Sequence, residues 1–124
     1  FAGVNELLQQ LSQAGVPLAL VTTNSKSNVR HVLGAQNTAL IQAFECGVGI
    51  LGKKGKFRRL LRRFHVKPHE TLVIGDEMRD LEAARKAGIP FGAVAWGYTR
   101  PEALQAHHPA EVFHTMQEIA AAVL

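Results

Sequence analysis

The feature that most constrains the fold of this chain is the alternation of short apolar runs with segments of helical periodicity. Residues 18–21 and 71–74 are apolar runs typical of strands that are buried on both faces. Elsewhere apolar residues recur at the spacing of one helix face, as Phe57, Leu60 and Phe64 do. Because strands separated by helices form βαβ units, we predict an α/β fold with a parallel sheet.

The expected elements follow from this periodicity and from the positions of Gly, Pro and Ser. Strands are expected at residues 18–21, 71–74, 91–95 and 111–113, with a strand or loop at 46–51. Helices are expected at residues 4–14, 27–33 (capped by Ser27), 38–44, 57–64, 78–87, 102–106 and 117–124. Binding sites in parallel sheets gather beyond the carboxyl ends of the strands. The segments that follow Val21, Ile74 and Ala95 are therefore the places to search.

Composition excludes several classes of protein. The 124 residues are 47% hydrophobic and 19% charged, which favours a packed globular domain over a disordered chain. No apolar run approaches the ~18 residues that a membrane span needs. The single cysteine, Cys46, excludes an internal disulfide and fits a reducing cytoplasm. We expect one domain, or part of one, in a cytoplasmic protein with no membrane partner.

Positive charge is concentrated in one segment. Eight of the fourteen Lys and Arg residues lie in residues 53–67, so the rest of the chain has six cations against ten carboxylates. Such a segment can bind RNA or an acidic partner. Its helical periodicity offers a simpler interpretation, in which Phe57 and Leu60 face the core and the arginines face water. We favour the solvated face and do not expect nucleic acid as a partner, but a binding module that uses this helix stays an alternative.

Polar side chains follow the first predicted strand. Thr22, Thr23 and Asn24 leave the apolar run and precede a predicted helix. Hydroxyl, amide and backbone N–H groups at the start of a helix form a good binding site for phosphate. The same residue types are also favoured as simple helix caps, so this pattern alone is a weak signal.

Three carboxylates follow the second predicted strand. Asp76, Glu77 and Asp80 lie within five residues, and the two aspartates are the only ones in the chain. Carboxylate oxygens suit Mg²⁺, which takes one or two of them and completes its shell with water and phosphate oxygens. An acidic first helix turn would explain Glu77 and Asp80 without a metal. It explains Asp76 less well, because that residue directly follows Gly75 at the end of the strand.

Two phosphate-binding patterns overlap in the stretch ECGVGILGKKGK, residues 45–56. Three glycines spell the dinucleotide fingerprint G-x-G-x-x-G, and two of them with Lys53 match most of a P-loop. A P-loop requires Ser or Thr after its lysine, but Lys54 stands there. Against dinucleotide binding, we expect a poor strand at residues 43–46 and an interruption of the following helix at Gly55. We therefore expect this chain not to bind a nucleotide.

The motifs, taken in order, resemble the haloacid dehalogenase (HAD) superfamily of Mg²⁺-dependent phosphatases. They are LVTTNS after the first strand, Lys53 at the start of a later helix, and VIGDEMRDLEAARKAG at the second strand. The resemblance covers nearly the whole chain and is greatest for the phosphoglycolate-phosphatase-like group. It implies that residues 1–124 form part of a three-layer, Rossmann-like parallel sheet. It also implies hydrolysis of a small phosphorylated metabolite.

The resemblance implies roles for the residues that would contact phosphate. Thr22 matches the hydroxyl that hydrogen-bonds the transferring phosphoryl group, with Thr23 and Asn24 supplying neighbouring contacts. Lys53 matches the lysine that offsets negative charge at the phosphate. Spacing alone does not choose among Lys53, Lys54 and the nearby Lys56, so the assignment to Lys53 depends on the resemblance.

The resemblance also implies a Mg²⁺ cofactor. Asp76 matches a ligand of the metal. Asp80 matches the second acid of the same motif, which acts near the metal or through water and Lys53. Glu77 stands where the family more often has serine, and it would join the groups around the metal.

The family's first motif, a strand that ends in D-x-D, is absent from these 124 residues. In the family its first aspartate attacks phosphorus, its second is the general acid and base, and its strand lies between those ending at Thr22 and at Asp76. Because the chain also begins with Phe1, we expect it to be the C-terminal part of a longer protein that holds the nucleophile, the central strand and a helical cap. We expect the 124 residues alone to be inactive. An inactive relative, a dehalogenase and a phosphomutase are the alternatives.

Overall fold

The structure is a computed structural model, and it describes residues 3–47, 53–96, 102 and 109–124. The chain divides into two compact units, which are described separately here: a first unit of Phe1–Ile50 with Met116–Leu124, and a second unit of Leu51–Thr115. Among the helices of the described segments, none is long and apolar enough to cross a membrane.

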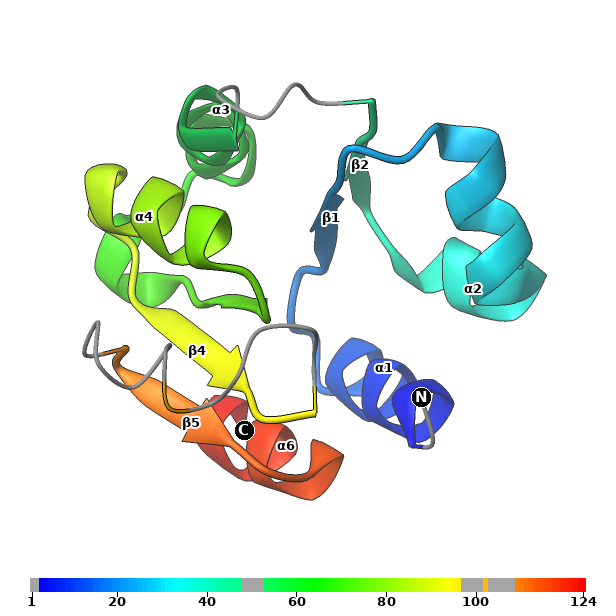
Figure 1. The fold of residues 1–124 in the computed structure, drawn as a ribbon. Helices are drawn as coiled ribbons and strands as arrows, with labels where there is room; N and C mark the ends of the chain where they lie inside the picture. Colours follow the sequence, from blue (N-terminus) through cyan, green and yellow to red (C-terminus); the bar gives the residue numbers. More distant parts are fainter. Residues whose placement is uncertain (1–2, 48–52, 97–101, 103–108) are drawn as a thin grey trace. The chain divides into compact units, whose positions relative to one another are not determined.

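The first unit combines helices with a pair of parallel strands (Figure 1). Its elements are α1 (Val4–Gln13), β1 (Ala19–Val21), α2 (Lys26–Leu40), β2 (Ala43–Glu45) and α6 (Met116–Val123). β1 pairs with β2 in parallel, with Ala19 opposite Ala43. α1 packs against both α2 and α6, and Leu11 of α1 is buried there with Ile119 of α6.

The backbone of helix α2 is interrupted, and side chains form hydrogen bonds to carbonyl groups around the break. Gly34 has φ 82° and ψ 162°, which interrupts the helical backbone. The buried Asn37 donates from Nδ2 to the carbonyl of Leu33 at 3.1 Å and to Oδ1 of Asn5 at 2.5 Å. Thr38 donates its hydroxyl to the carbonyl of Gly34 at 2.7 Å. These side-chain hydrogen bonds satisfy carbonyl groups at the break, and the bond to Asn5 ties α2 to α1.

The second unit places helices beside a three-stranded parallel sheet (Figure 1). Its elements are α3 (Lys53–Phe64), a 3₁₀ turn (Pro68–Glu70), β3 (Val73–Gly75), α4 (Met78–Lys86), β4 (Phe91–Val94) and β5 (Glu111–Phe113). The strand order is β3-β4-β5, so β4 is central, and all four of its residues are buried. α4 packs against β3, β4 and α3. The α/β class and the parallel pairing predicted from the sequence are confirmed.

Helix α3 has the two faces that its sequence predicts. Phe57 and Leu60 are buried, with 7% and 8% of their surfaces exposed. The arginines of the same helix lie on its exposed side: Arg58, Arg59, Arg62 and Arg63. Arg58 also donates to the carbonyl of Lys86 at the end of α4, at 3.1 Å. The predicted solvated face is confirmed, and the predicted core face is confirmed at Phe57 and Leu60, whereas Leu61 and Phe64, also expected there, are only partly buried.

Three expectations about local structure are wrong. Residues 38–44 do not form a helix of their own: α2 continues to Leu40, and β2 begins at Ala43, where pairing with β1 outweighs the weak strand propensity of that segment. Gly55 does not interrupt α3, because a glycine costs only ~1 kcal/mol in a helix whose apolar face is buried. Ser27 does not cap α2. That role belongs to Ser25, whose Oγ accepts from the N–H of Asn28 at 3.3 Å.

The expectation that two strands are buried on both faces is also only partly met. β1 and β3 are edge strands of their sheets, with no partner on the other edge among the described residues. Ile74 of β3 is 39% exposed, and Ala19 of β1 is also exposed. Most of the helix expected at 102–106 and most of the segment 46–51 lie outside the described residues.

Candidate active site

The segment that joins β3 to α4 carries the predicted carboxylates. Asp76 follows β3 directly and is half-buried. Glu77 occupies the N-cap position of α4 with an extended backbone, but its side chain makes no capping hydrogen bond. Glu77 instead pairs with Arg79 at 3.7 Å, and both side chains are about half exposed. A pair this exposed adds little stability, so it leaves Glu77 available to other partners.

Lys53 and Asp80 form an ion pair within the second unit. Lys53 is the first residue of α3 and Asp80 lies in the first turn of α4, 27 residues further along the chain. The ammonium group donates a hydrogen bond to Oδ1 of Asp80. Both side chains are largely buried, with 12% and 15% of their surfaces exposed. Because water screens a pair in such a site less than a surface pair, the contact gives Lys53 a defined position beyond the carboxyl end of β3.

Gly75, the last residue of β3, lies against the same carboxylate. A β-carbon built on Gly75 would be 2.9 Å from Oδ2 of Asp80, which is shorter than a normal contact. Asp80 is therefore contacted by Lys53 at Oδ1, and its Oδ2 occupies the space that a side chain at the end of β3 would fill. In the sequence, Gly75 stands out only as the residue before Asp76. Its position directly before the acidic motif was the available signal.

The chemistry of these side chains suits a hard cation such as Mg²⁺. Asp76, Glu77 and Asp80 offer carboxylate oxygens, and Mg²⁺ needs only one or two of them because water and substrate complete its shell. Within the part of the chain that the structure describes, no three His, Cys, Asp or Glu side chains converge closely enough to hold a metal by themselves. These donors fit a Mg²⁺ ion held by two protein carboxylates, with water and substrate as its other ligands, better than an ion enclosed by protein ligands alone.

The predicted phosphate-binding residues, Thr22, Thr23 and Asn24, lie in the first unit, after β1. The N–H of Thr22 extends the β1–β2 ladder by donating to the carbonyl of Glu45 at 3.0 Å. The hydroxyl of Thr22 accepts from the N–H of Asn24 at 3.1 Å, and the carbonyl of Asn24 accepts from Gly47 at 2.7 Å. Thr22 is half-buried, whereas Thr23 and Asn24 are exposed. The turn is thus held by its own hydrogen bonds and ends at the N-terminus of α2.

The structure therefore brings together part of the predicted site. Lys53 and Asp80 are in contact, and Asp76 and Glu77 belong to the same unit. Thr22, Thr23 and Asn24 belong to the other unit. Thr22 of the first unit and Asp76 of the second unit each directly follow a parallel strand, as the rule for such sheets leads one to expect.

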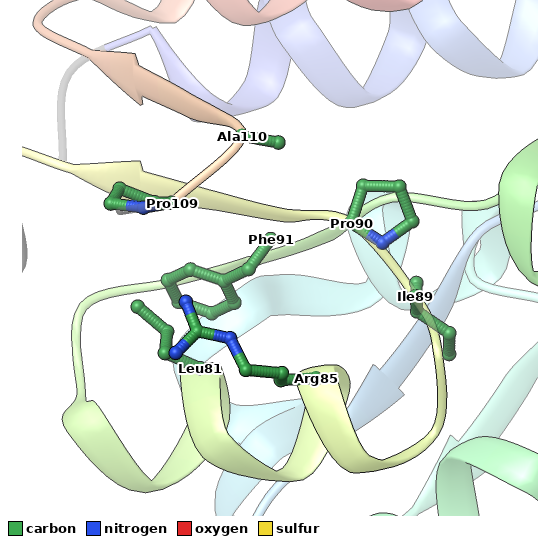
Figure 2. Close-up of a pocket in the computed structure, with 7 residues that line it drawn as sticks. All are labelled: Leu81, Arg85, Ile89, Pro90, Phe91, Pro109 and Ala110. Carbon is green, nitrogen blue, oxygen red and sulfur yellow. The ribbon is translucent and has the colours of Figure 1, made fainter. Parts of the chain in front are cut away.

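A pocket of about 200 Å³ lies elsewhere in the second unit (Figure 2). Its lining includes Leu81 and Arg85 of α4, together with Phe91 and Ala110. In Figure 2 the side chains of Leu81 and Arg85 extend from α4 toward the strand residues. Phe91 opens β4, and Ala110 directly precedes β5, so the pocket is at the amino ends of these strands. The candidate site is at the opposite, carboxyl end of the sheet, and the pocket is not part of it.

The dinucleotide alternative needs a new assessment, because both structural arguments against it are wrong. A strand, β2, does precede Gly47, and α3 does continue through Gly55. Neither argument therefore counts against the dinucleotide fingerprint, of which Gly49 and Gly52 lie outside the described residues. Lys54, in the place of Ser or Thr, still excludes a complete P-loop.

Parallel strands alternating with helices, with polar side chains gathered after the strands, define a Rossmann-like α/β protein. The family model of haloacid dehalogenase-like hydrolases matches residues 1–94. The chain therefore belongs to the haloacid dehalogenase-like hydrolase family.

Individual relatives agree with this assignment. The phosphoglycolate phosphatase of Synechococcus elongatus is 33% identical over 124 residues, which covers 99% of this chain and 58% of that protein. The phosphoglycolate phosphatase of Escherichia coli is 29% identical over 125 residues, 96% of this chain and 49% of the relative. A crystal structure of a predicted phosphoglycolate phosphatase from Haemophilus somnus has a TM-score of 0.88 at 24% identity and covers 100% of this chain and 57% of that one. The chain thus spans about half the length of the curated relatives it matches.

Proposed function

We propose that the intact protein is a Mg²⁺-dependent phosphatase that hydrolyses a small phosphorylated metabolite in the cytoplasm. The observation that carries the proposal is the contact between Lys53 and Asp80 beyond the carboxyl end of β3, in a chain of the haloacid dehalogenase-like family. The names of the relatives make 2-phosphoglycolate the first substrate to test.

Lys53 would supply positive charge to the phosphoryl group. A lysine with little exposed surface interacts strongly with charge that develops in the transition state, because water does not screen it. Asp80 would hold the ammonium group in place through the hydrogen bond to Oδ1. A preorganised cation of this kind needs no rearrangement as the reaction proceeds.

Thr22 would donate a hydrogen bond to an oxygen of a phosphoryl group. Its hydroxyl accepts from the N–H of Asn24, and a hydroxyl that accepts one hydrogen bond can still donate its own proton. Thr23 and Asn24 are exposed beside it and would add contacts from side chain or backbone. The nearby N-terminus of α2 favours a negatively charged group.

Asp76 would be the principal ligand of Mg²⁺, with Asp80 and Glu77 as further carboxylates near the metal. The support is the chemistry of the donors and the place of Asp76 directly after β3. When bound, Mg²⁺ would polarise a phosphoryl oxygen and neutralise its charge. Residues of the chain would orient the substrate and the metal relative to each other.

The attacking carboxylate would be an aspartate outside these 124 residues, which contain no D-x-D. It would form an aspartyl-phosphate that water then hydrolyses. This part of the proposal is supported by the span of about half the relatives' length and by the edges of β1 and β3 that have no partner strand among the described residues. We accordingly propose that residues 1–124 are part of a catalytic domain and are inactive alone.

The test is a reaction screen with the intact protein and Mg²⁺. Release of inorganic phosphate is measured for 2-phosphoglycolate, other small phosphate monoesters and p-nitrophenyl phosphate. We expect phosphate release from at least one small phosphate monoester. Conversion of a sugar phosphate into its isomer without phosphate release would indicate a mutase, and halide release from a haloacid would indicate a dehalogenase. Either result without phosphatase activity would contradict the proposal.

A further inference from the structure

We propose that Gly75 is a positioning residue for the site: its lack of a side chain lets the Asp80 carboxylate lie against the end of β3 and so places the Lys53 ammonium group. The proposal rests on the proposed function only where activity is the readout. Its geometric part concerns the second unit alone.

The backbone of Gly75 does not itself require glycine. The described glycines with positive φ are Gly3, Gly15, Gly34, Gly47 and Gly88. Gly75 is not one of them, and it belongs to β3, where it pairs with Ala93 of β4. An alanine can adopt such an extended conformation without strain. Glycine is therefore needed at this position for a steric reason: Oδ2 of Asp80 lies where a side chain would be.

The steric conflict is confined to one oxygen atom. A β-carbon on Gly75 would be 2.9 Å from Oδ2 of Asp80, but 3.4 Å from Cβ of Asp80 and from Cε1 of Phe91. The two longer distances are ordinary contacts. Because Oδ2 is at the end of a short side chain, rotation of the carboxylate relieves the conflict at a modest cost in free energy. An alanine at residue 75 is thus expected to move the carboxylate and leave the fold intact.

The movement matters because the same carboxylate contacts Lys53. Oδ1 of Asp80 accepts from the Lys53 ammonium group, and both side chains are largely buried. Displacing Oδ2 rotates Oδ1 as well, so the ammonium group loses or changes its contact. A misplacement of ~1 Å in a catalytic group can cost roughly a hundredfold in rate. Gly75 would in this way control the site without contacting substrate.

The experiment compares two glycine-to-alanine variants of the intact protein. Gly75→Ala is the test, and Gly55→Ala is the matched control, because a β-carbon on Gly55 meets nothing within 4 Å. We expect Gly75→Ala to lower the turnover of a phosphate monoester by ~10- to 100-fold while its thermal midpoint stays close to that of the wild type. Gly55→Ala should keep wild-type turnover.

A double-mutant cycle shows whether Gly75 acts through Asp80. In an Asp80→Ala background there is no carboxylate to displace, so adding Gly75→Ala should cause no further loss. An equal further loss in that background would overturn the proposal. The proposal would also be overturned if Gly75→Ala unfolds the protein and the double variant with Asp80→Ala is unfolded as well. The steric conflict would then lie with Phe91.

A spectroscopic readout separates this proposal from the proposed function. The NMR signals of the Lys53 ε-methylene and ammonium groups report the contact with Asp80 whether or not any ester is hydrolysed. We expect these signals to shift in Gly75→Ala and to stay in place in Gly55→Ala. Unchanged Lys53 signals in Gly75→Ala would overturn the role of Gly75. Shifted signals in a protein that hydrolyses no phosphate ester would support that role and contradict only the phosphatase.

Discussion

The ammonium group of Lys53 donates a hydrogen bond to Oδ1 of Asp80, and this contact ties the first residue of α3 to the first turn of α4. Lys53 thus contacts an aspartate of the acidic motif, and the neighbouring Lys54 and Lys56, which carry the same charge, serve as comparisons. The pair provides both a stability test and an activity test of the candidate site.

Loss of the Lys53 side chain should destabilise the second unit. In Lys53→Ala the Asp80 carboxylate stays largely buried without its donor, so we expect the free energy of unfolding to fall by about 1–3 kcal/mol. Lys54→Ala, the adjacent control, should change it by less than about 0.5 kcal/mol. Urea unfolding of the intact protein measures both, and phosphate release should fall strongly only for Lys53→Ala. If Lys54→Ala is the damaging change, the assignment of the lysine is wrong.

Substitution of Gly92 in the central strand should be more disruptive than substitution of Gly75. A β-carbon on Gly92 would be 2.5 Å from Cε2 of Phe113, a ring buried in the core of the second unit. Since a packed ring cannot move as a terminal carboxylate can, Gly92→Ala should cost about 1–3 kcal/mol of stability. The thermal unfolding midpoint of Gly92→Ala is compared with that of Gly55→Ala. Equal midpoints for the two variants would contradict the close packing of Gly92 and Phe113.

The break in α2 provides a test within the first unit. Asn37→Ala removes both hydrogen bonds of the buried amide, including the one to the Leu33 carbonyl, and should lower stability by about 1–3 kcal/mol. Gln36→Ala, at an exposed neighbouring position, should have little effect. Hydrogen exchange in α2 measures the local change. Equal protection in both variants would show that the amide does not stabilise the break.

The arginine face of α3 should be dispensable for catalysis. Arg59, Arg62 and Arg63 are exposed on the side of the helix opposite Phe57 and Leu60, so reversing their charges to Glu should leave phosphate release within about twofold of the wild type. The same variant tests the binding-module alternative. If the wild type binds RNA at physiological salt and the triple variant does not, the binding-module alternative is favoured. We expect no RNA binding by the wild type.

The sequence was sufficient to predict the α/β class, because the alternation of strands and helices is visible in local apolar periodicity. The same periodicity identified the buried face of α3 at Phe57 and Leu60. It failed at β2, a segment of three residues, Ala43–Glu45, whose strand conformation depends on pairing with β1. Tertiary pairing of this kind leaves no signal in a window of a few residues.

The details of the site were less accessible to sequence reasoning. Spacing did not choose among three lysines, because the partner of Lys53 lies 27 residues away and only the packing of α3 on α4 brings them together. The steric relation between Gly75 and Asp80 was hidden for a similar reason, since a glycine at the end of a strand is usually interpreted as part of a turn. Both relations depend on contacts that form only in the folded chain.

The most direct test of the central claim is the Mg²⁺ dependence of phosphate release by the intact protein, measured for the wild type and for Asp76→Asn. Phosphate release from a small phosphate monoester is followed as Mg²⁺ is titrated after removal of divalent cations by chelation. We predict that activity appears with Mg²⁺ in the wild type and is lost in Asp76→Asn, whose fold is checked by circular dichroism. Activity without any divalent cation, or unchanged turnover in Asp76→Asn, would contradict the account.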